Sequence, residues 1–159
     1  MTRPGEPLRS ALVALLAGGL AAGVLDIVYA FALAAARGGT PMRVLHSVAS
    51  GLLGAPAYKG GVLTAALGLA LHLGITFAAA AVYFAVARRS PLVQRHYLAA
   101  GSLFGVLVYL VMNFVVLPLS AVPFKVGYTP WVLLQGFVSH ALLVGVPIAL
   151  SLHLMRFKR

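Results

Sequence analysis

Three side chains that can bind protons or cations stand inside long apolar segments of this sequence: Asp26, His72 and His140. The carboxylate of Asp26 can hold a proton or a small cation, and each imidazole can take up a proton near neutral pH. An ionisable group in the middle of an apolar helix is costly unless it faces other helices or water. The residue types therefore indicate proton or ion chemistry, provided that the segments bring the three side chains together.

The apolar segments are long enough to carry these residues through a membrane. They cover about residues 10–36, 61–87, 97–117 and 131–154, and about 20 apolar residues suffice to cross the hydrocarbon core. A composition of 62% hydrophobic and 9% charged residues is that of a membrane protein. The first segment exceeds the usual signal-peptide core of about 7–15 residues, so we expect it to be retained. We predict an all-α, four-transmembrane-helix bundle that forms one integral membrane domain over residues 1–159.

The charged residues lie between the apolar segments. Lys and Arg number 12 against 2 acids, which gives a net charge of +10. Because these cations do not gather on one compact face, we expect no nucleic acid partner; membrane topology and contact with anionic lipids of the bilayer explain them better. The positive-inside rule predicts cytoplasmic N and C termini, since the cations on that side outnumber those on the other. The terminal side carries Arg3, Arg9, Arg88, Arg89, Arg95, Arg156, Lys158 and Arg159, and the opposite side carries Arg37, Arg43, Lys59 and Lys125.

A shorter helix is expected over about 41–54. Thr40 is a suitable N-cap before a proline at the first helical position, and about 14 residues are too few to cross the bilayer. We therefore predict an interfacial or re-entrant helix at the outer side. One face of this helix is polar, and with a lysine in the following turn it forms a group made of Arg43, His46, Ser47, Ser50 and Lys59. This group either lies among the headgroups or forms a lid over the Asp26 site that selects anions or headgroups.

Counting along the spans places the ionisable residues at one depth. His72 and His140 stand ten or eleven residues from the outer ends of their spans, and so does Asp26, which corresponds to about 15 Å. Asn113 is expected about 8 Å deep, and Tyr29 shares the helix face of Asp26 because it follows three residues later. The sequence thus predicts a polar site of Asp26, Tyr29, His72, Asn113 and His140 near the middle of the membrane.

Several functions fit such a site. It can bind or conduct a proton, a cation or a small polar solute, or it can be an interhelical hydrogen-bond cluster in which Asp26 accepts from His72 and His140. A haem between the two imidazoles and a zinc ion held by all three residues are further alternatives, although we expect no cofactor. The chain has no cysteine and no catalytic motif, so we do not expect an enzyme.

Glycine pairs recur in the two halves of the chain. The pattern G-x-x-x-G-V-L begins at Gly19 and again at Gly101, and G-x-x-x-H ends at His72 and again at His140. This spacing suggests a parallel two-fold internal repeat. Small residues one turn apart let helix backbones approach closely. We expect Gly19, Gly23, Gly101 and Gly105 to pack helices within the chain, or to form an interface in a homo-oligomer or with other subunits if the protein is a non-catalytic accessory or assembly subunit.

The segments Leu25–Tyr29, Arg43–Gly54 and Tyr109–Ser120 carry a resemblance to a known group of proteins. Between about Gly19 and Leu150 the chain resembles small four-span proteins of the bacterial inner membrane that have no assigned activity. The resemblance implies a multi-pass protein of the bacterial inner (plasma) membrane. It implies no mechanism, because no activity comes with it.

Overall fold

Four long helical segments make up most of the molecule. The structure is a computed structural model that describes residues 6–156, with side chains from Ser10 to Met155. Within this part of the chain all regular structure is helical, and the four segments Ser10–Ala35, Gly61–Ala87, Tyr97–Leu119 and Pro130–Met155 are long and apolar enough to cross a membrane. The predicted fold class is therefore confirmed, and the segment lengths are those of a multi-pass membrane protein.

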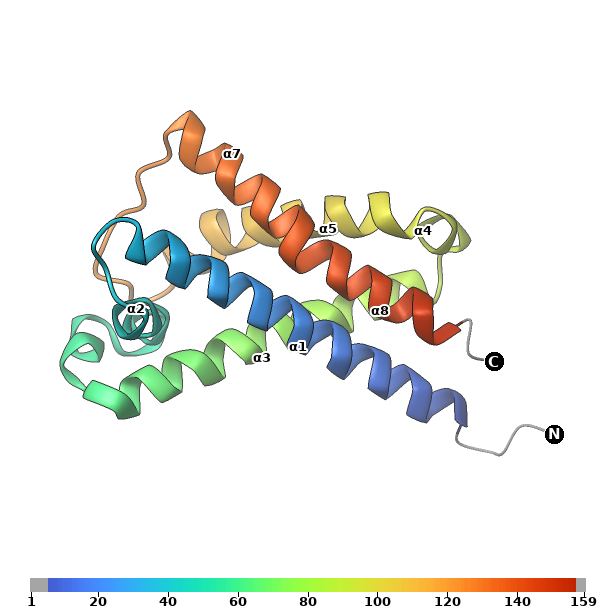
Figure 1. Ribbon diagram of the computed structural model, residues 1–159, viewed down its shortest axis with the longest axis horizontal. Coiled ribbons are helices and arrows are strands. Elements are labelled where there is room, and N and C mark those ends of the chain that lie inside the picture. Colours follow the sequence, from blue (N-terminus) through green and yellow to red (C-terminus); the bar gives the residue numbers. More distant parts are fainter. Residues whose placement is uncertain (1–5, 157–159) are drawn as a thin grey trace.

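The first two spans are unbroken α-helices and the last two contain π-helical turns. The first span is α1 (Glu6–Ala35) and the second is α3 (Gly61–Ala87). The third span consists of α5 (Tyr97–Val111), η2 (Met112–Val116) and α6 (Leu117–Leu119). The fourth consists of α7 (Pro130–Ser139), η3 (His140–Gly145) and α8 (Val146–Arg156). The start of α1 and the end of α8 lie at the same end of the molecule, here called the terminal end (Figure 1).

Short helices connect the spans. Helix α2 (Pro41–Leu53) begins at Thr40, whose hydroxyl accepts a hydrogen bond from the backbone of Arg43 at 3.2 Å. It is followed by η1 (Ala55–Lys59), where a simple turn was expected, and α4 (Pro91–Arg95) joins the second and third spans. Figure 1 shows α2 end-on, so this helix runs across the spans at the end opposite the termini, here called the α2 end.

Helix α1 is central to the bundle. It packs against α3 on one side and against η3 and α8 on the other, while α5 packs against the far side of the fourth span. A cluster of buried apolar residues fills the half nearer the termini, with members from α1, α3 and the fourth span: Ala22, Ala80, Tyr83, Ala87, Val144, Ile148 and Ala149.

Each π-helical turn ends two residues before a proline. Segment η2 stops at Val116 before Pro118, and η3 stops at Gly145 before Pro147. A proline cannot donate its backbone hydrogen bond, and its ring collides with the carbonyl four residues earlier. A wider π turn lets the helix continue past this collision.

The predicted glycine pairs all lie at contacts between helices of this chain. A Cβ on Gly19 or Gly23 would collide with Phe77 or Thr76 of α3, and one on Gly101 or Gly105 would collide with the backbone of Gly145 or His140 in η3. In both halves the first helix packs through its glycines on the second helix of the same half. These contacts match the intrachain role expected for the four glycines.

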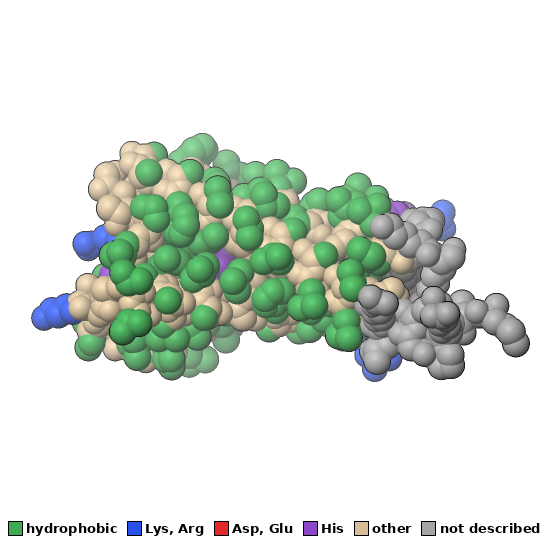
Figure 2. Space-filling view, turned by 60° about the horizontal axis from the view of Figure 1, so that its bottom comes forward, with side chains coloured by type: hydrophobic (Ala, Val, Ile, Leu, Met, Phe, Trp, Pro, Cys, Tyr) green, Lys and Arg blue, Asp and Glu red, His purple; other side chains and the backbone are tan. Residues whose placement is uncertain are grey.

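The outer surface of the spans is apolar. Large apolar side chains are exposed along all four spans, for example Leu16, Val82, Leu103 and Leu142. On the face shown in Figure 2, Lys and Arg side chains lie at the two ends of the molecule and the surface between them is mostly hydrophobic. This distribution suits a molecule whose middle contacts lipid and whose ends contact headgroups and water.

We expect Gly105→Ala to destabilise the fold. The added methyl group meets the His140 carbonyl and the Ala141 Cα of the neighbouring span, and overpacking of this kind costs about 1–3 kcal/mol. The matched control is Gly74→Ala, because Gly74 is also inside a span but its Cβ would have no neighbour within 4 Å. Thermal unfolding in detergent should show a lower midpoint for Gly105→Ala alone, and equal midpoints would contradict the close contact.

Candidate functional site

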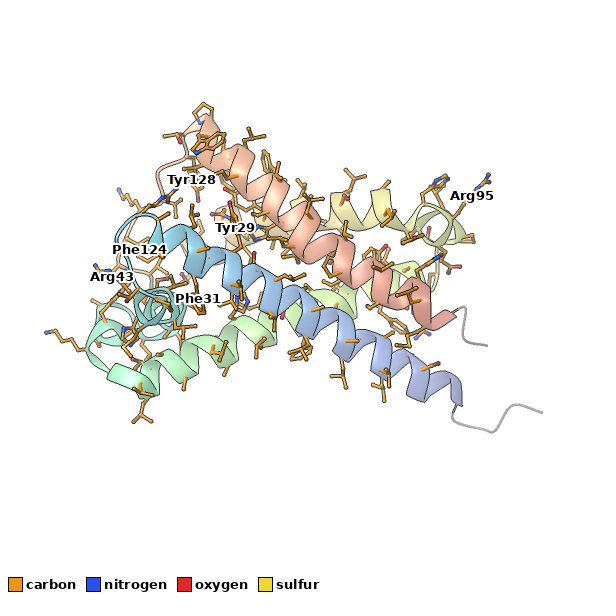
Figure 3. The ribbon with its side chains drawn as sticks, viewed as in Figure 1. Tyr29, Phe31, Arg43, Arg95, Phe124 and Tyr128 are labelled. Atoms are coloured by element: carbon orange, nitrogen blue, oxygen red, sulfur yellow. The ribbon has the colours of Figure 1, made fainter. Side chains whose placement is uncertain are left out.

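Asp26 lies half-buried in the middle of the first span. Its neighbour Ile27 is buried, Val24 and Val28 are exposed, and Tyr29 is half-buried on the Asp26 side of the helix. Figure 3 shows Tyr29 projecting from α1 on the side where α5 and α7 lie. In the described part of the chain the Asp26 carboxylate accepts no hydrogen bond and forms no ion pair. A carboxylate at this depth is therefore held without a paired donor.

His72 contacts the first span through the backbone of Gly23. Its Nε2 lies 2.9 Å from the Gly23 carbonyl oxygen, which is one turn from Asp26 on α1. A carbonyl oxygen only accepts, so Nε2 must carry the proton and donate it. The interhelical cluster in which Asp26 accepts from His72 is thus not formed. His72 is bound to the backbone of α1 instead, because the glycine faces bring that backbone within reach.

His140 also donates to a backbone carbonyl, but with its other nitrogen. Its Nδ1 lies 3.1 Å from the carbonyl oxygen of Gly136, one turn earlier in the same span, and 3.3 Å from Ser139 Oγ. Since the carbonyl only accepts, Nδ1 carries the proton in the neutral ring. Asp26 and His72 both lie within electrostatic range of His140. Charges on three spans therefore act on one another around His140.

The hydrogen bonds define what the group can accept. The N–H of His72 donates to the Gly23 carbonyl, and the N–H of His140 donates to the Gly136 carbonyl. In the neutral rings, Nδ1 of His72 and Nε2 of His140 are therefore left as acceptors. The ionised carboxylate of Asp26 is an acceptor as well. A group made of acceptors, with one negative charge, favours a proton or a cation over an anion.

Tyr109 is a site neighbour that the sequence analysis missed. Its side chain is 5% exposed, its ring centroid lies 5.0 Å from that of His140 in an edge contact, and it packs over Gly136. The signal was present in the sequence, since Tyr109 follows Gly105 by four residues and so shares the glycine face of the third span.

Asn113 lies beyond Tyr109 and makes no direct contact with the acid or the imidazoles. Its side-chain nitrogen donates to the carbonyl of Tyr109 at 2.9 Å, one turn back on the same span. Its own carbonyl accepts from the hydroxyl of Tyr128 at 2.9 Å. Asn113 therefore belongs to a polar group that starts at the α2 end and reaches His140 through Tyr109.

Two alternative uses of the histidines find no support in the geometry. Among the residues that the structure describes, no three His, Asp or Glu side chains are grouped closely enough to hold a metal ion, so the three-ligand zinc site is not assembled. A haem between His72 and His140 would have to lie between the spans that carry them, and α1 occupies that place.

The polar group of α2 is only partly at the surface. Arg43 and Lys59 are exposed, but His46 is 7% exposed and Ser50 is fully buried. His46 contacts the Gly61 carbonyl at 2.8 Å and the ring of Tyr58, while the guanidinium of Arg43 lies 5.7 Å from the same tyrosine ring. The expectation of a helix with its polar face in the headgroups is therefore wrong for His46 and Ser50, and their polar face is turned toward the protein.

Helix α2 covers the α3 side of the site rather than the site as a whole. The backbone of its Leu45 packs directly on Gly68, one turn from His72 toward the α2 end. Its C-terminal part reaches the loop that follows the third span, where the amide of Ala121 donates to the Gly51 carbonyl at 3.0 Å. This position is that of a lid on one half of the bundle, and the polar side chains of Ser47 and Ser50 bond to carbonyls of α2 itself.

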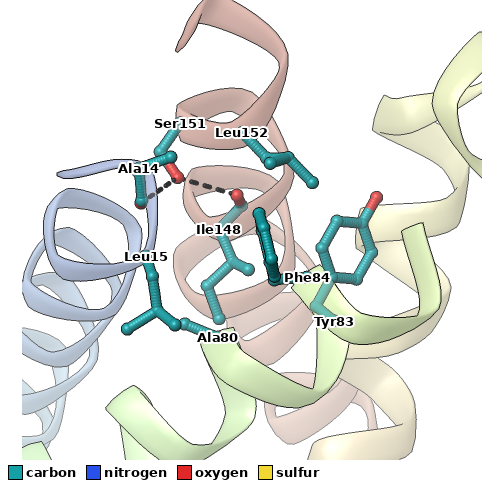
Figure 4. A pocket seen from close by; sticks show the side chains of 8 residues that line it. All are labelled: Ala14, Leu15, Ala80, Tyr83, Phe84, Ile148, Ser151 and Leu152. Atoms are coloured by element: carbon teal, nitrogen blue, oxygen red, sulfur yellow. Dashed lines mark hydrogen bonds between the residues drawn. The ribbon is translucent and has the colours of Figure 1, made fainter. Parts of the chain in front are cut away.

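A small pocket at the terminal end is separate from this group (Figure 4). It is lined mainly by apolar side chains of α1, α3 and α8, including Ala14 and Ile148. The hydroxyl of Ser151 lies 3.0 Å from the Ala14 carbonyl and 2.8 Å from the Ile148 carbonyl. The pocket thus belongs to the packing of the terminal half and adds no ionisable group to the site.

The fold and the site together define a four-span bundle with one acid and two histidines grouped in its middle. No protein-family model matches the chain, and neither a curated protein nor a solved structure matches it. The functional argument therefore depends on the geometry of the site.

We expect the two membrane histidines to have opposite neutral tautomers. The bonds to Gly23 and Gly136 place the proton on Nε2 of His72 and on Nδ1 of His140. The measurement is ¹⁵N NMR of histidine-labelled protein in detergent at a pH where both rings are neutral, with His72→Asn and His140→Asn to assign the signals. The same tautomer in both rings would contradict the described bonds.

Proposed function

We propose that this protein is an integral membrane protein whose intramembrane site binds or conducts a proton or a small cation. The observation that carries the proposal is the arrangement of acceptors: Asp26 has no hydrogen-bond donor among the described residues, and His72 and His140 donate to the backbone. Such a site lacks a positive partner, which an incoming proton or cation supplies. A small polar solute with a cationic or donor group is compatible with the same acceptors.

The proposal explains why a costly acid is present. In a purely structural cluster the imidazoles would donate to the carboxylate, because unpaired charges inside a membrane destabilise the fold. Here both imidazoles donate elsewhere while the carboxylate stays within electrostatic range of His140. Stability alone does not account for Asp26, and residues retained at a cost to stability are typical of functional sites.

The rival interpretation, an accessory or assembly subunit, is less well supported. In that interpretation the glycine faces are the surface that binds other subunits. In the structure, however, these faces pack on helices of the same chain, at Gly19, Gly23, Gly101 and Gly105. A homo-oligomer remains part of the proposal if the protein conducts ions, because four helices are too few to enclose a wide pore. Its interface would then use other surfaces.

The proposed location is the bacterial inner membrane, with both termini in the cytoplasm and anionic lipids as the partners of the exposed cations. It is supported by the excess of Lys and Arg on the terminal side. Aromatic side chains at the other end suit a membrane–water interface. Phe124 and Tyr128 lie there with Arg43, whereas Arg95 lies at the terminal end (Figure 3).

Asp26→Asn should abolish proton or cation movement while the protein still folds. The amide keeps the shape of the side chain and removes its charge. Purified protein is reconstituted into vesicles with an entrapped pH dye, and proton entry is driven by a potassium diffusion potential. Sodium entry under the same potential tests whether the site conducts a small cation. Glu6→Gln is the matched control, since Glu6 is the other acid and lies at the very start of α1.

Thermal unfolding of the same variants separates function from structure. We expect Asp26→Asn to be as stable as the wild type or more stable, because an unpaired charge is removed from the bundle. A variant that melts much lower would instead mark Asp26 as structural, and a variant that retains full ion movement would contradict the proposed site.

A further inference from the structure

Among the residues that the structure describes, polar groups connect the site to the α2 end. From the α2 end they follow the third span: the Tyr128 hydroxyl donates to the Asn113 backbone carbonyl, the Asn113 side chain donates to the Tyr109 backbone carbonyl, and the Tyr109 ring contacts His140 of the fourth span. Tyr128 is 38% exposed and lies within electrostatic range of Tyr109, whereas Tyr109 is buried. The series thus runs from an accessible phenol in the loop to a buried imidazole, which in turn lies within electrostatic range of Asp26.

The π-helical turns lie on this series. Asn113 stands in η2, and His140 is the first residue of η3. A π turn disturbs the regular hydrogen-bond ladder, and such turns are often found at functional sites. In a membrane, irregular backbone is tolerated where it is buried in protein or lines a polar path. The two irregular turns therefore coincide with the polar residues, although each span has long regular sections elsewhere.

The terminal side of the site is closed by apolar packing. One turn beyond Asp26 toward the termini stands Ala22, and one turn beyond His140 stands Val144; both are buried members of the same apolar cluster. One turn beyond His72 stands Thr76, whose hydroxyl donates to its own helix at Leu73. Two turns beyond His140, Ile148 continues the cluster.

The α3 side of the site is closed at the α2 end as well. Helix α2 packs its backbone on Gly68, directly above His72. In the described part of the chain, the side formed by the third and fourth spans carries polar groups out to the loop that precedes α7.

We propose that protons reach His140 and Asp26 from the α2 end along the polar side chains of Tyr128, Asn113 and Tyr109, with water carrying the proton past the backbone carbonyls and the aromatic ring of this series. This inference rests on the proposed function and adds its direction of access. The site exchanges protons with the aqueous phase at the α2 end, and the apolar cluster separates it from the phase at the terminal end. Tyr109 is a positioning residue here, because its hydroxyl lies over Gly136, whose carbonyl accepts from His140, while its ring contacts the His140 ring.

The absence of native cysteine permits a direct test by single cysteine substitutions. Asn113→Cys lies on the proposed path, whereas Val115→Cys lies at the same depth on the exposed, lipid-facing side of η2. A charged, membrane-impermeant methanethiosulfonate reagent is added to one side of the membrane at a time. Lys59→Cys and Arg89→Cys, at opposite ends of the molecule, report which side each reagent pool reaches.

We expect Asn113→Cys to react from the same side as Lys59→Cys, and at least about tenfold faster than Val115→Cys, because thiols in apolar surroundings stay protonated and unreactive. Ile148→Cys, in the apolar cluster, should be unreactive from both sides. Equal rates for Asn113→Cys and Val115→Cys, or reaction of Asn113→Cys from the side of Arg89→Cys, would overturn the proposed route.

A second pair of variants tests the proposed proton route if Asn113→Cys fails to fold. Tyr109→Phe and Tyr83→Phe each remove one hydroxyl from a buried tyrosine, but Tyr83 lies in the terminal half and donates to Tyr97. Proton entry into vesicles should fall severalfold for Tyr109→Phe alone, and equal rates for both variants would overturn the route. Cysteine labelling does not depend on ion movement, so a failed route and a failed site give different results. A failed route alters the labelling of Asn113→Cys or leaves Tyr109→Phe as active as Tyr83→Phe while Asp26→Asn is still inactive, and a failed site leaves Asp26→Asn fully active.

Discussion

The close approach of helix backbones at glycine is the constraint on which the site depends. Lipid offers no hydrophobic driving force between helices, so packing and short backbone distances must hold them together. Gly101 and Gly105 let α5 touch the backbone of η3 directly, with Gly145 opposite. This contact fixes the third span against the start of η3, and it is the reason why Tyr109 lies over Gly136 and against the His140 ring.

Close backbone contacts at glycine also occur in the first half of the chain, but the histidine there has a different hydrogen-bond partner. Gly23 brings α1 so near to α3 that the His72 side chain reaches a backbone carbonyl of α1. In the second half, the corresponding Gly105 meets the backbone of His140, and the imidazole turns to its own helix at Gly136. Matching positions of the two glycine patterns thus lie at a helix contact in each half. The two histidines nevertheless present different nitrogens, and only the first half supplies an acid.

Much of the fold could be predicted from the sequence because length and capping are local properties. Apolar length marked the spans, and Thr40 with Pro41 marked the start of α2 at the observed residue. The hydrogen-bond partners could not be predicted, since they depend on how each helix is rotated about its axis. Counting residues gave the depth of His72, but it could not predict that His72 donates to the Gly23 carbonyl and not to Asp26.

The π-helical turns and the orientation of α2 were harder to predict, because they too depend on contacts between helices. Hydrophobic periodicity does not reveal a π turn, although a proline two residues after Val116 or Gly145 was a usable signal. An amphipathic pattern also does not say which face is buried when one side meets lipid and headgroups. Helix α2 turns His46 inward because the Gly61 carbonyl at the start of α3 offers it an acceptor.

The balance of donors and acceptors decides what kind of ligand suits the middle of the bundle. A structural cluster needs as many donors as acceptors, and the donors of His72 and His140 are already used by backbone carbonyls. An anion would add further acceptors and negative charge beside Asp26, which the apolar surroundings penalise strongly. A proton on the carboxylate or on either ring supplies the missing donor, and a small cation supplies the missing positive charge. The group of Asp26, His72 and His140 therefore favours positively charged ligands by the same physics that makes the unpaired acid costly.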